Sequence, residues 1–220
     1  MIKAVIFDHD GVIADTEPIS FIADNSVLAR YGFSISSEEN EALIGISSRE
    51  GWVTFKEMFK IPEAVDWLVS EKTREAINIV KSSGIKPSEG LLKLISMLQS
   101  KGFKLAIASG ANRAFIDAVL EKLGISSFFQ AIISWENVAK GKPDPEAYIK
   151  TSQKLGISPS DCVAIEDSSS GIMAAKAAGM RCVALRMPST ASHDVSMADL
   201  VINSLSELST ESLSGLERKQ

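Results

Sequence analysis

The chain has 220 residues, of which 45% are hydrophobic and 23% charged, and its formal net charge is −5. This is ordinary globular composition, long enough for one domain or for a core with a modest insertion. The negative balance argues against a nucleic-acid ligand and against attraction to anionic membranes. No apolar stretch has membrane-spanning length, and the first residues lack the apolar region of a signal peptide. Cys162 and Cys182 are isolated thiols within apolar runs, so we expect a protein of the reducing cytoplasm.

Short apolar runs predict the strands of a sheet. They lie at residues 2–7, 104–109, 131–134, 162–167, 181–185 and 200–203. Each run is continuous rather than alternating, as in parallel strands that are buried on both faces. Helical periodicity predicts helices between them, over residues 91–99, 112–123, 145–155 and 171–178. Strand and helix alternate with short loops, which predicts an α/β fold: a Rossmann-like, doubly wound parallel sheet with right-handed crossovers.

Residues 17 to about 84 differ, because they show helical periodicity throughout and no continuous apolar run of the strand type. The spacing predicts helices around 19–31, 52–59 and 67–80. We therefore expect two domains: an α/β catalytic core made of 1–15 and 85–220, and an all-helical cap of 16–84 inserted after the first strand. Hinges are expected near 14–16, where the first strand leads into the cap, and near 82–87, where serine, glycine and proline gather.

Reactive side chains follow the predicted strands. The residues in question are Asp8 and Asp10 after the first strand, Ser109 and Gly110, then Glu166 and Asp167, with Lys142 in an intervening loop. Ligands of open α/β sheets bind beyond the carboxyl ends of the strands. Several carboxylates with a hydroxyl and a lysine suit Mg²⁺ and a phosphoryl group, since Mg²⁺ prefers hard oxygen ligands. Such a cation would also offset the repulsion between clustered acids.

The motifs that carry this chemistry are DHDGV with DTEP at 8–18, ASG around Ser109, GKPDP at 141–145 and EDSSSG at 166–171. In this order they resemble the four signature motifs of the haloacid dehalogenase-like hydrolase superfamily. The likeness is greatest to its branch of sugar phosphatases and β-phosphoglucomutase-like enzymes with a helical cap, and it covers nearly the whole chain. It implies a Mg²⁺-dependent hydrolase of a small phosphomonoester, a phosphorylated sugar or related metabolite. We expect a monomer, because a self-capped enzyme needs no partner subunit to close its site.

The resemblance also implies roles for the acids. Asp8 would be the nucleophile that forms an aspartyl-phosphate and would contact the metal. Asp10 would be the general acid/base, and its backbone carbonyl would bind the metal. Glu166 and Asp167 would be the acidic metal anchors.

Other residues would hold the substrate. Ser109 would donate a hydrogen bond to the transferring phosphoryl group, helped by the amide of Gly110, and Lys142 would pair with Asp8 and neutralise phosphoryl charge. Thr16 matches a family residue that links core and cap, although a plain helix N-cap explains it nearly as well. Arg49, in the cap loop, would contact substrate or would be an exposed helical arginine.

The sequence departs from the family pattern at three positions. His9 stands where the family usually has an apolar residue; alternation predicts that it points away from the metal, with a minor chance of an electrostatic role. Ser20 and Ile44 stand where β-phosphoglucomutases carry a histidine and a lysine. Their loss weakens the mutase interpretation.

Three alternatives to a phosphatase stay open at this point. A β-phosphoglucomutase-type isomerase would use the same nucleophile with a different acceptor. Relatives that cleave carbon–halogen or carbon–phosphorus bonds are disfavoured, because dehalogenases lack the second aspartate and phosphonate hydrolases need a cap lysine. A non-catalytic binding protein that retains the fold would have no reason to keep all four motifs.

Overall fold

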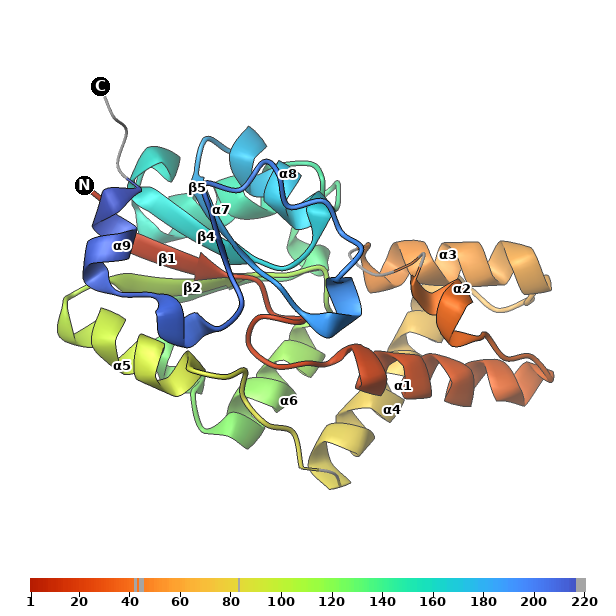
Figure 1. The fold of residues 1–220 in the computed structure, drawn as a ribbon. Coiled ribbons are helices and arrows are strands. Elements are labelled where there is room, and N and C mark those ends of the chain that lie inside the picture. Colours follow the sequence, from red (N-terminus) through yellow and green to blue (C-terminus); the bar gives the residue numbers. More distant parts are fainter. Residues whose placement is uncertain (42, 44–45, 83, 217–220) are drawn as a thin grey trace.

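The computed structural model describes residues 1–41, 43, 46–82 and 84–216. Its centre is a parallel sheet of six strands in the order β3-β2-β1-β4-β5-β6 (Figure 1). The strands are β1 (Ala4–Phe7), β2 (Lys104–Ala108), β3 (Ala131–Ile133), β4 (Cys162–Glu166), β5 (Arg181–Leu185) and β6 (Leu200–Ile202). Each matches a predicted strand, and several end one residue earlier than expected. The predicted doubly wound α/β sheet is confirmed.

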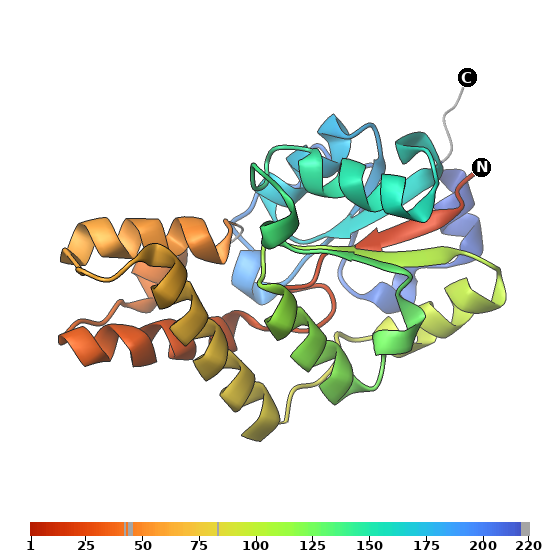
Figure 2. The ribbon, with the colours of Figure 1, turned by 180° about the vertical axis from the view of Figure 1, so that it is seen from behind.

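Helices cover both faces of the sheet, as Figures 1 and 2 show. Helices α5 (Leu91–Ser100), α6 (Arg113–Leu123) and α9 (Thr210–Gly215) lie on one face, and α7 (Glu146–Leu155) and α8 (Ser169–Ala177) on the other. Within β1, Val5 and Phe7 join the first layer, whereas Ala4 and Ile6 join the second. Because successive side chains of a strand point to opposite faces, a strand covered on both sides must be apolar throughout.

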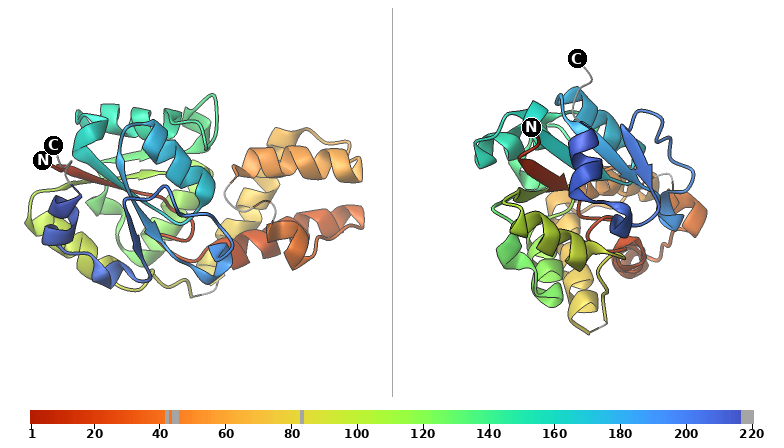
Figure 3. Two further views of the ribbon diagram at one scale, coloured as in Figure 1. Left: turned by 45° about the horizontal axis from the view of Figure 1, so that its top comes forward. Right: turned by 60° about the vertical axis from the view of Figure 1, so that its left-hand side comes forward.

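The helical lobe consists of α1 (Glu17–Leu28), α2 (Ser37–Glu41), α3 (Ser48–Phe59) and α4 (Val65–Ser82). It stands beyond the carboxyl ends of the strands (Figure 3) and has an apolar core of its own, which includes Trp52, Phe55 and Leu68. Helix α3 begins with a capping box, in which the hydroxyl of Ser47 and the carboxylate of Glu50 each accept a hydrogen bond from the other's backbone N–H.

Short 3₁₀ helices complete the connections: η1 (Ala29–Tyr31), η2 (Ser126–Phe128), η3 (Trp135–Asn137), η4 (Pro159–Asp161), η5 (Pro188–Thr190) and η6 (Leu205–Glu207). Helix α2 was not predicted, since its five residues are polar and too few to show a period. Ile44 and part of the predicted hinge at 82–87, residue 83, lie outside the described residues. Among the described helices, none combines the length and apolarity needed to cross a bilayer.

Candidate active site

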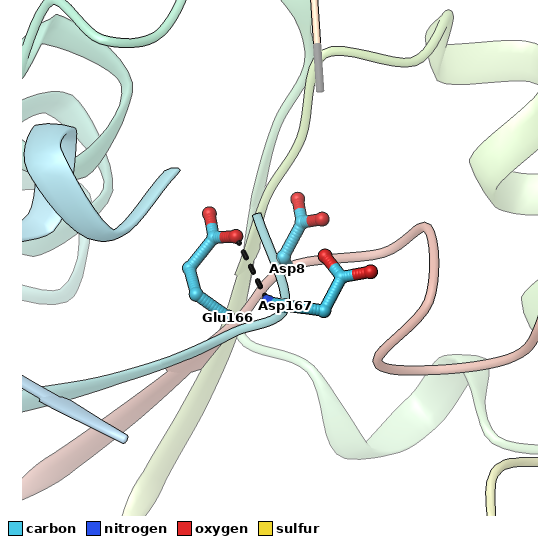
Figure 4. Close-up of side chains that lie close together, drawn as sticks. All are labelled: Asp8, Glu166 and Asp167. Carbon is cyan, nitrogen blue, oxygen red and sulfur yellow. Dashed lines mark hydrogen bonds between the residues drawn. The ribbon is translucent and has the colours of Figure 1, made fainter. Parts of the chain in front are cut away.

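Three carboxylates meet where β1 and β4 end (Figure 4). Asp8 follows β1 directly, Glu166 is the last residue of β4, and Asp167 comes next. Because β1 and β4 are neighbours in the sheet, acids far apart in sequence come together. Each offers one oxygen, and these oxygens lie within 4.8 Å of one another. All three residues are buried, so their mutual repulsion is poorly screened.

Lys142 offsets part of this negative charge. Its Nζ atom lies 2.6 Å from Asp8 Oδ1 and 2.5 Å from Glu166 Oε1. Burial acts to lower the pKa of Lys142, but the two carboxylates raise it above its ordinary value, so the ammonium keeps its charge. Glu166 also accepts hydrogen bonds from the hydroxyls of Tyr148 and Ser168. With both of its oxygens engaged by protein donors, Glu166 fixes the position of Lys142.

One ammonium does not neutralise the group. Burial raises the pKa of Asp8 to about 7 although Lys142 lowers it, and the charges of Glu166 and Asp10 raise it further. Burial, followed by the charges of Asp8 and Glu166, raises the pKa of Asp167 well above its usual value. A further cation would therefore stabilise the ionised acids. Their hard oxygen donors fit Mg²⁺.

Two glycines make room for these acids. Gly11 has a φ of 76°, and a Cβ built there would lie 2.0 Å from Oδ2 of Asp167. A Cβ on Gly171, in the first turn of α8, would lie 2.0 Å from Cδ of Glu166. The glycines of the DHDGV and EDSSSG motifs are thus explained by the close approach of a carboxylate rather than by a turn alone.

The side chain of Asp10 is held apart from the three acids. Its Oδ1 atom accepts a hydrogen bond from the hydroxyl of Thr16 and lies 3.0 Å from Nδ1 of His9. Its Oδ2 atom lies 3.5 Å from Oγ of Ser109 and lines the cleft. Burial acts to raise the pKa of Asp10, but His9 and Thr16 hold it well below its ordinary value. Its predicted metal contact is through the backbone carbonyl and stays a prediction.

His9 contacts Asp10 and is not part of the group of three acids, so its predicted direction away from the metal stays a prediction. It is fully buried, contacts Asp10 through Nδ1, and meets the ring of Phe115 edge-on at 5.6 Å between centroids. Strand alternation does not apply here, because β1 ends at Phe7 and the chain then turns at Gly11. In the described part of the chain, Nε2 of His9 has no hydrogen-bond partner.

The predicted phosphoryl-binding residues lie at the end of β2. Ser109 is buried, and its Oγ accepts a hydrogen bond from the backbone N–H of Ala111 at 2.9 Å. Gly110 lines the same cleft, and its carbonyl accepts a hydrogen bond from the N–H of Ser48 in the helical lobe at 3.4 Å. The lobe thus touches the sheet domain beside the predicted phosphoryl site.

The cleft lies between the acids and the helical lobe. Its wall on the lobe includes Glu17, Ser20 and Asp24 from α1, Trp52 from α3 and Lys72 from α4. None of these was predicted as a site residue. The signal in the sequence is the spacing of Glu17, Ser20 and Asp24, which places three polar groups on one face of a helix that is otherwise apolar inside.

Thr16 and Arg49 do not line the cleft. Thr16 is buried and occupies the N-cap position of α1, yet its hydroxyl makes no capping bond and donates to Asp10 instead. Arg49 is exposed, and its Nε lies 3.1 Å from Oδ1 of Asp66. The geometry supports a linking role for Thr16 and does not bring Arg49 to the cleft, so its substrate contact stays a prediction.

Known proteins of similar sequence and structure include phosphate-handling enzymes. A phosphorylated carbohydrates phosphatase of Thermotoga maritima is 33% identical over 178 residues, which cover 81% of this chain and 82% of that protein. A β-phosphoglucomutase of Bacillus subtilis is 33% identical over 220 residues, which cover 96% of this chain and 93% of that protein. A mutant of CbbY from Rhodobacter sphaeroides, solved in complex with xylulose-(1,5)bisphosphate, has a TM-score of 0.92 at 28% identity and covers 99% of this chain and 100% of its own.

The family is established by its sequence profile as well. Residues 5–185 match the family described as haloacid dehalogenase-like hydrolase. This span includes the motifs at the ends of β1, β2 and β4 and the loop that carries Lys142. The chain therefore belongs to the haloacid dehalogenase-like hydrolases.

Proposed function

We propose that the chain hydrolyses a small phosphomonoester, a phosphorylated sugar or related metabolite, with Mg²⁺ as cofactor and Asp8 as nucleophile. The observation that carries this is the contact of Lys142 with Asp8 at 2.6 Å, beside Asp167 and below the cleft. A lysine in this place holds a carboxylate ready for attack and neutralises charge on an incoming phosphoryl group.

In the first step an oxygen of Asp8 attacks phosphorus and the bond to the leaving oxygen breaks. Asp10 gives that oxygen a proton, which yields the free alcohol and an aspartyl-phosphate. In this structure Asp10 is held as a carboxylate, whereas an anionic phosphoryl group beside it would raise its pKa and favour the protonated form. Ser109, Gly110 and Lys142 would bind the phosphoryl oxygens.

In the second step Asp10 takes a proton from water, the water oxygen attacks phosphorus, and the carboxylate of Asp8 leaves. The sum is ester plus water to alcohol plus inorganic phosphate. Asp8 and Asp167 would hold Mg²⁺, with Glu166 close by, and the ion would supply charge neutralisation at the phosphoryl group.

The helical lobe would act as the cap. We propose that 16–84 forms a domain that covers the core of 1–15 and 85–220 and excludes bulk water during the reaction. The hydrogen bond from Ser48 to Gly110 and the contribution of α1, α3 and α4 to the cleft support this. Because one chain contributes both walls of the cleft, a monomer would suffice.

The mutase alternative is supported by the similarity to the Bacillus subtilis enzyme, and two departures from the mutase pattern weigh against it. Ser20 lines the cleft where β-phosphoglucomutases carry a histidine. Ile44, which replaces their lysine, lies outside the described residues. A mutase must retain a bisphosphorylated intermediate, whereas a hydrolase releases phosphate, so the products decide between them.

The test is release of phosphate from p-nitrophenyl phosphate and from a panel of sugar and polyol phosphates, with Mg²⁺ and with EDTA. The wild type is expected to release phosphate only with Mg²⁺. Asp8→Asn should abolish the activity, and Asp10→Asn should lower it roughly 100- to 10,000-fold, the usual share of general acid–base catalysis. Asp15→Asn is the matched control, because Asp15 is exposed and should leave the rate unchanged.

Two outcomes would contradict the proposal. Conversion of β-glucose 1-phosphate into glucose 6-phosphate without free phosphate would establish the mutase. Failure to release phosphate from every ester offered would favour a binding protein that has kept the fold.

A further inference from the structure

The wall of the cleft on the helical lobe carries more acidic than basic groups. Glu17 and Asp24 line it from one face of α1, and Lys72 lines it from α4. Asp24 and Lys72 are buried, while Glu17 is half-buried. Burial, then the charge of Asp10, raises the pKa of Glu17 to about 7 even though Lys72 lowers it. The wall is therefore short of positive charge.

The ammonium of Lys72 is already engaged. Its Nζ atom donates a hydrogen bond to Oγ of Ser20 at 3.1 Å, and its charge acts on Asp10, Glu17 and Asp24 at once. One cation facing three carboxylates has little attraction left for a second phosphate group of a substrate.

Other cations near this end of the molecule are directed elsewhere. Arg49 pairs with Asp66, and Arg113 pairs with Asp117 through its Nε at 2.9 Å. Neither arginine lines the cleft. The cap-loop residues outside the described part, 42, 44 and 45, are alanine, isoleucine and glycine in the sequence, so they add no charge. Among described residues that line the cleft, Lys72 and Lys142 supply the positive charge.

Asp24 and Glu17 have carboxylate oxygens that accept no hydrogen bond from the described residues. Oδ1 of Asp24 accepts a hydrogen bond from Nε1 of Trp52 at 2.8 Å, and no donor in the described residues reaches Oδ2. The carboxylate of Glu17 likewise receives no hydrogen bond from the described residues, although it lines the cleft. Carboxylate oxygens accept hydrogen bonds from hydroxyl groups, and Ser20 adds a hydroxyl between them.

We propose that the substrate carries a single phosphate, and that the part beyond its ester is an uncharged, hydroxyl-bearing chain held by Glu17 and Asp24. This deepens the proposed function and rests on it. A second phosphate at that end meets carboxylates instead of cations and binds poorly. The chain would thus differ from the CbbY structure that holds xylulose-(1,5)bisphosphate.

The test compares two ligands that differ by one phosphate, fructose 1-phosphate and fructose 1,6-bisphosphate. Their dissociation constants are measured by calorimetry with Mg²⁺, in an Asp8→Asn background that prevents turnover. The monophosphate is expected to bind at least about tenfold more tightly, which corresponds to about 1.4 kcal/mol. At a pH well above the Glu17 pKa of about 7, where its carboxyl is ionised, adding Glu17→Gln or Asp24→Asn should shrink this ratio at least about threefold, because each removes a charge that repels the second phosphate.

Glu57→Gln is the matched control, since Glu57 lies on α3 in the same lobe, is exposed and does not line the cleft, and it should leave the ratio unchanged. Asn at position 24 can still accept the hydrogen bond from Trp52, so that variant keeps the test valid if Glu17→Gln fails to fold. Equal binding of the two ligands, or a ratio that neither substitution moves, overturns the inference. Phosphate release by the wild type tests the proposed function independently of this binding comparison.

Discussion

Between Asp8 and Asp10, the fully buried His9 places its Nδ1 atom 3.0 Å from the carboxylate of Asp10. A hydrogen bond to a charged group is worth roughly 1.5–3 kcal/mol. We expect His9→Leu to lower kcat about tenfold or more with little change in KM, because Asp10 loses one of the two groups that contact its Oδ1 atom. The same variant should lose less stability than this hydrogen bond is worth, since Leu also removes the unpartnered Nε2 atom.

Steady-state kinetics and thermal unfolding separate these effects. His9→Asn is expected to restore kcat, because its side-chain amide can donate from nearly the position of Nδ1. Phe115→Leu removes the ring contact and leaves the hydrogen bond, so it should cost stability and spare kcat. A His9→Leu variant with the kinetics of the wild type would show that His9 only fills space.

Among the elements, α8 begins with little space for a side chain at Gly171, which faces Glu166 in the first turn. An alanine inside a helix usually stabilises a protein by roughly 0.5–1 kcal/mol relative to glycine. Here the added Cβ would lie 2.0 Å from the carboxylate that fixes Lys142. We expect Gly171→Ala to lower the free energy of unfolding by roughly 1–3 kcal/mol, as overpacking does, and to lower kcat.

Gly51→Ala is the control for this change, since Gly51 also lies in a helix and a Cβ there meets nothing within 4 Å. Denaturant unfolding should show it to be as stable as the wild type or more so. If Gly171→Ala proved equally harmless, the close approach of Glu166 to α8 would be wrong.

The sequence predicted the strands because burial on both faces determines their composition. β1 and β4 are apolar throughout because helices cover both faces, and this reading needs no tertiary information. The five-residue α2 carries no period. The roles of His9 and Thr16 were also missed or left open, because both depend on how the chain turns after β1, where strand alternation has ended.

At the scale of the whole molecule, the parallel topology brings predicted residues together. Neighbouring strands end at the same edge of the sheet, so Asp8, Ser109 and Asp167 could be expected at one place. The wall formed by Glu17, Asp24 and Lys72 could not, because it depends on how α1 and α4 are oriented over that edge. The position of the predicted site residues in the core could thus be predicted from motifs, whereas the cleft wall formed by the helical lobe depends on packing between the two lobes.

If the buried acids hold Mg²⁺ as proposed, the stability of the whole molecule should depend on the ion. An ion that binds the folded state alone adds about 2.7 kcal/mol at a hundred times its Kd. For a chain of this size that corresponds to a rise in Tm of roughly 5–10 °C. We expect this rise in the wild type, measured by calorimetry, and its loss on addition of EDTA.

Asp167→Asn should remove most of the rise, because it takes a charged oxygen from the group formed with Asp8 and Glu166. Its Tm without Mg²⁺ should not fall, since Asp167 is a buried acid whose ionisation burial disfavours. Asp117→Asn, an exposed acid paired with Arg113, should keep the full rise. The wild type could instead release phosphate with Mg²⁺ while its Tm stays the same with and without the ion. That result would mean that Mg²⁺ arrives bound to the substrate and that these acids do not hold it by themselves.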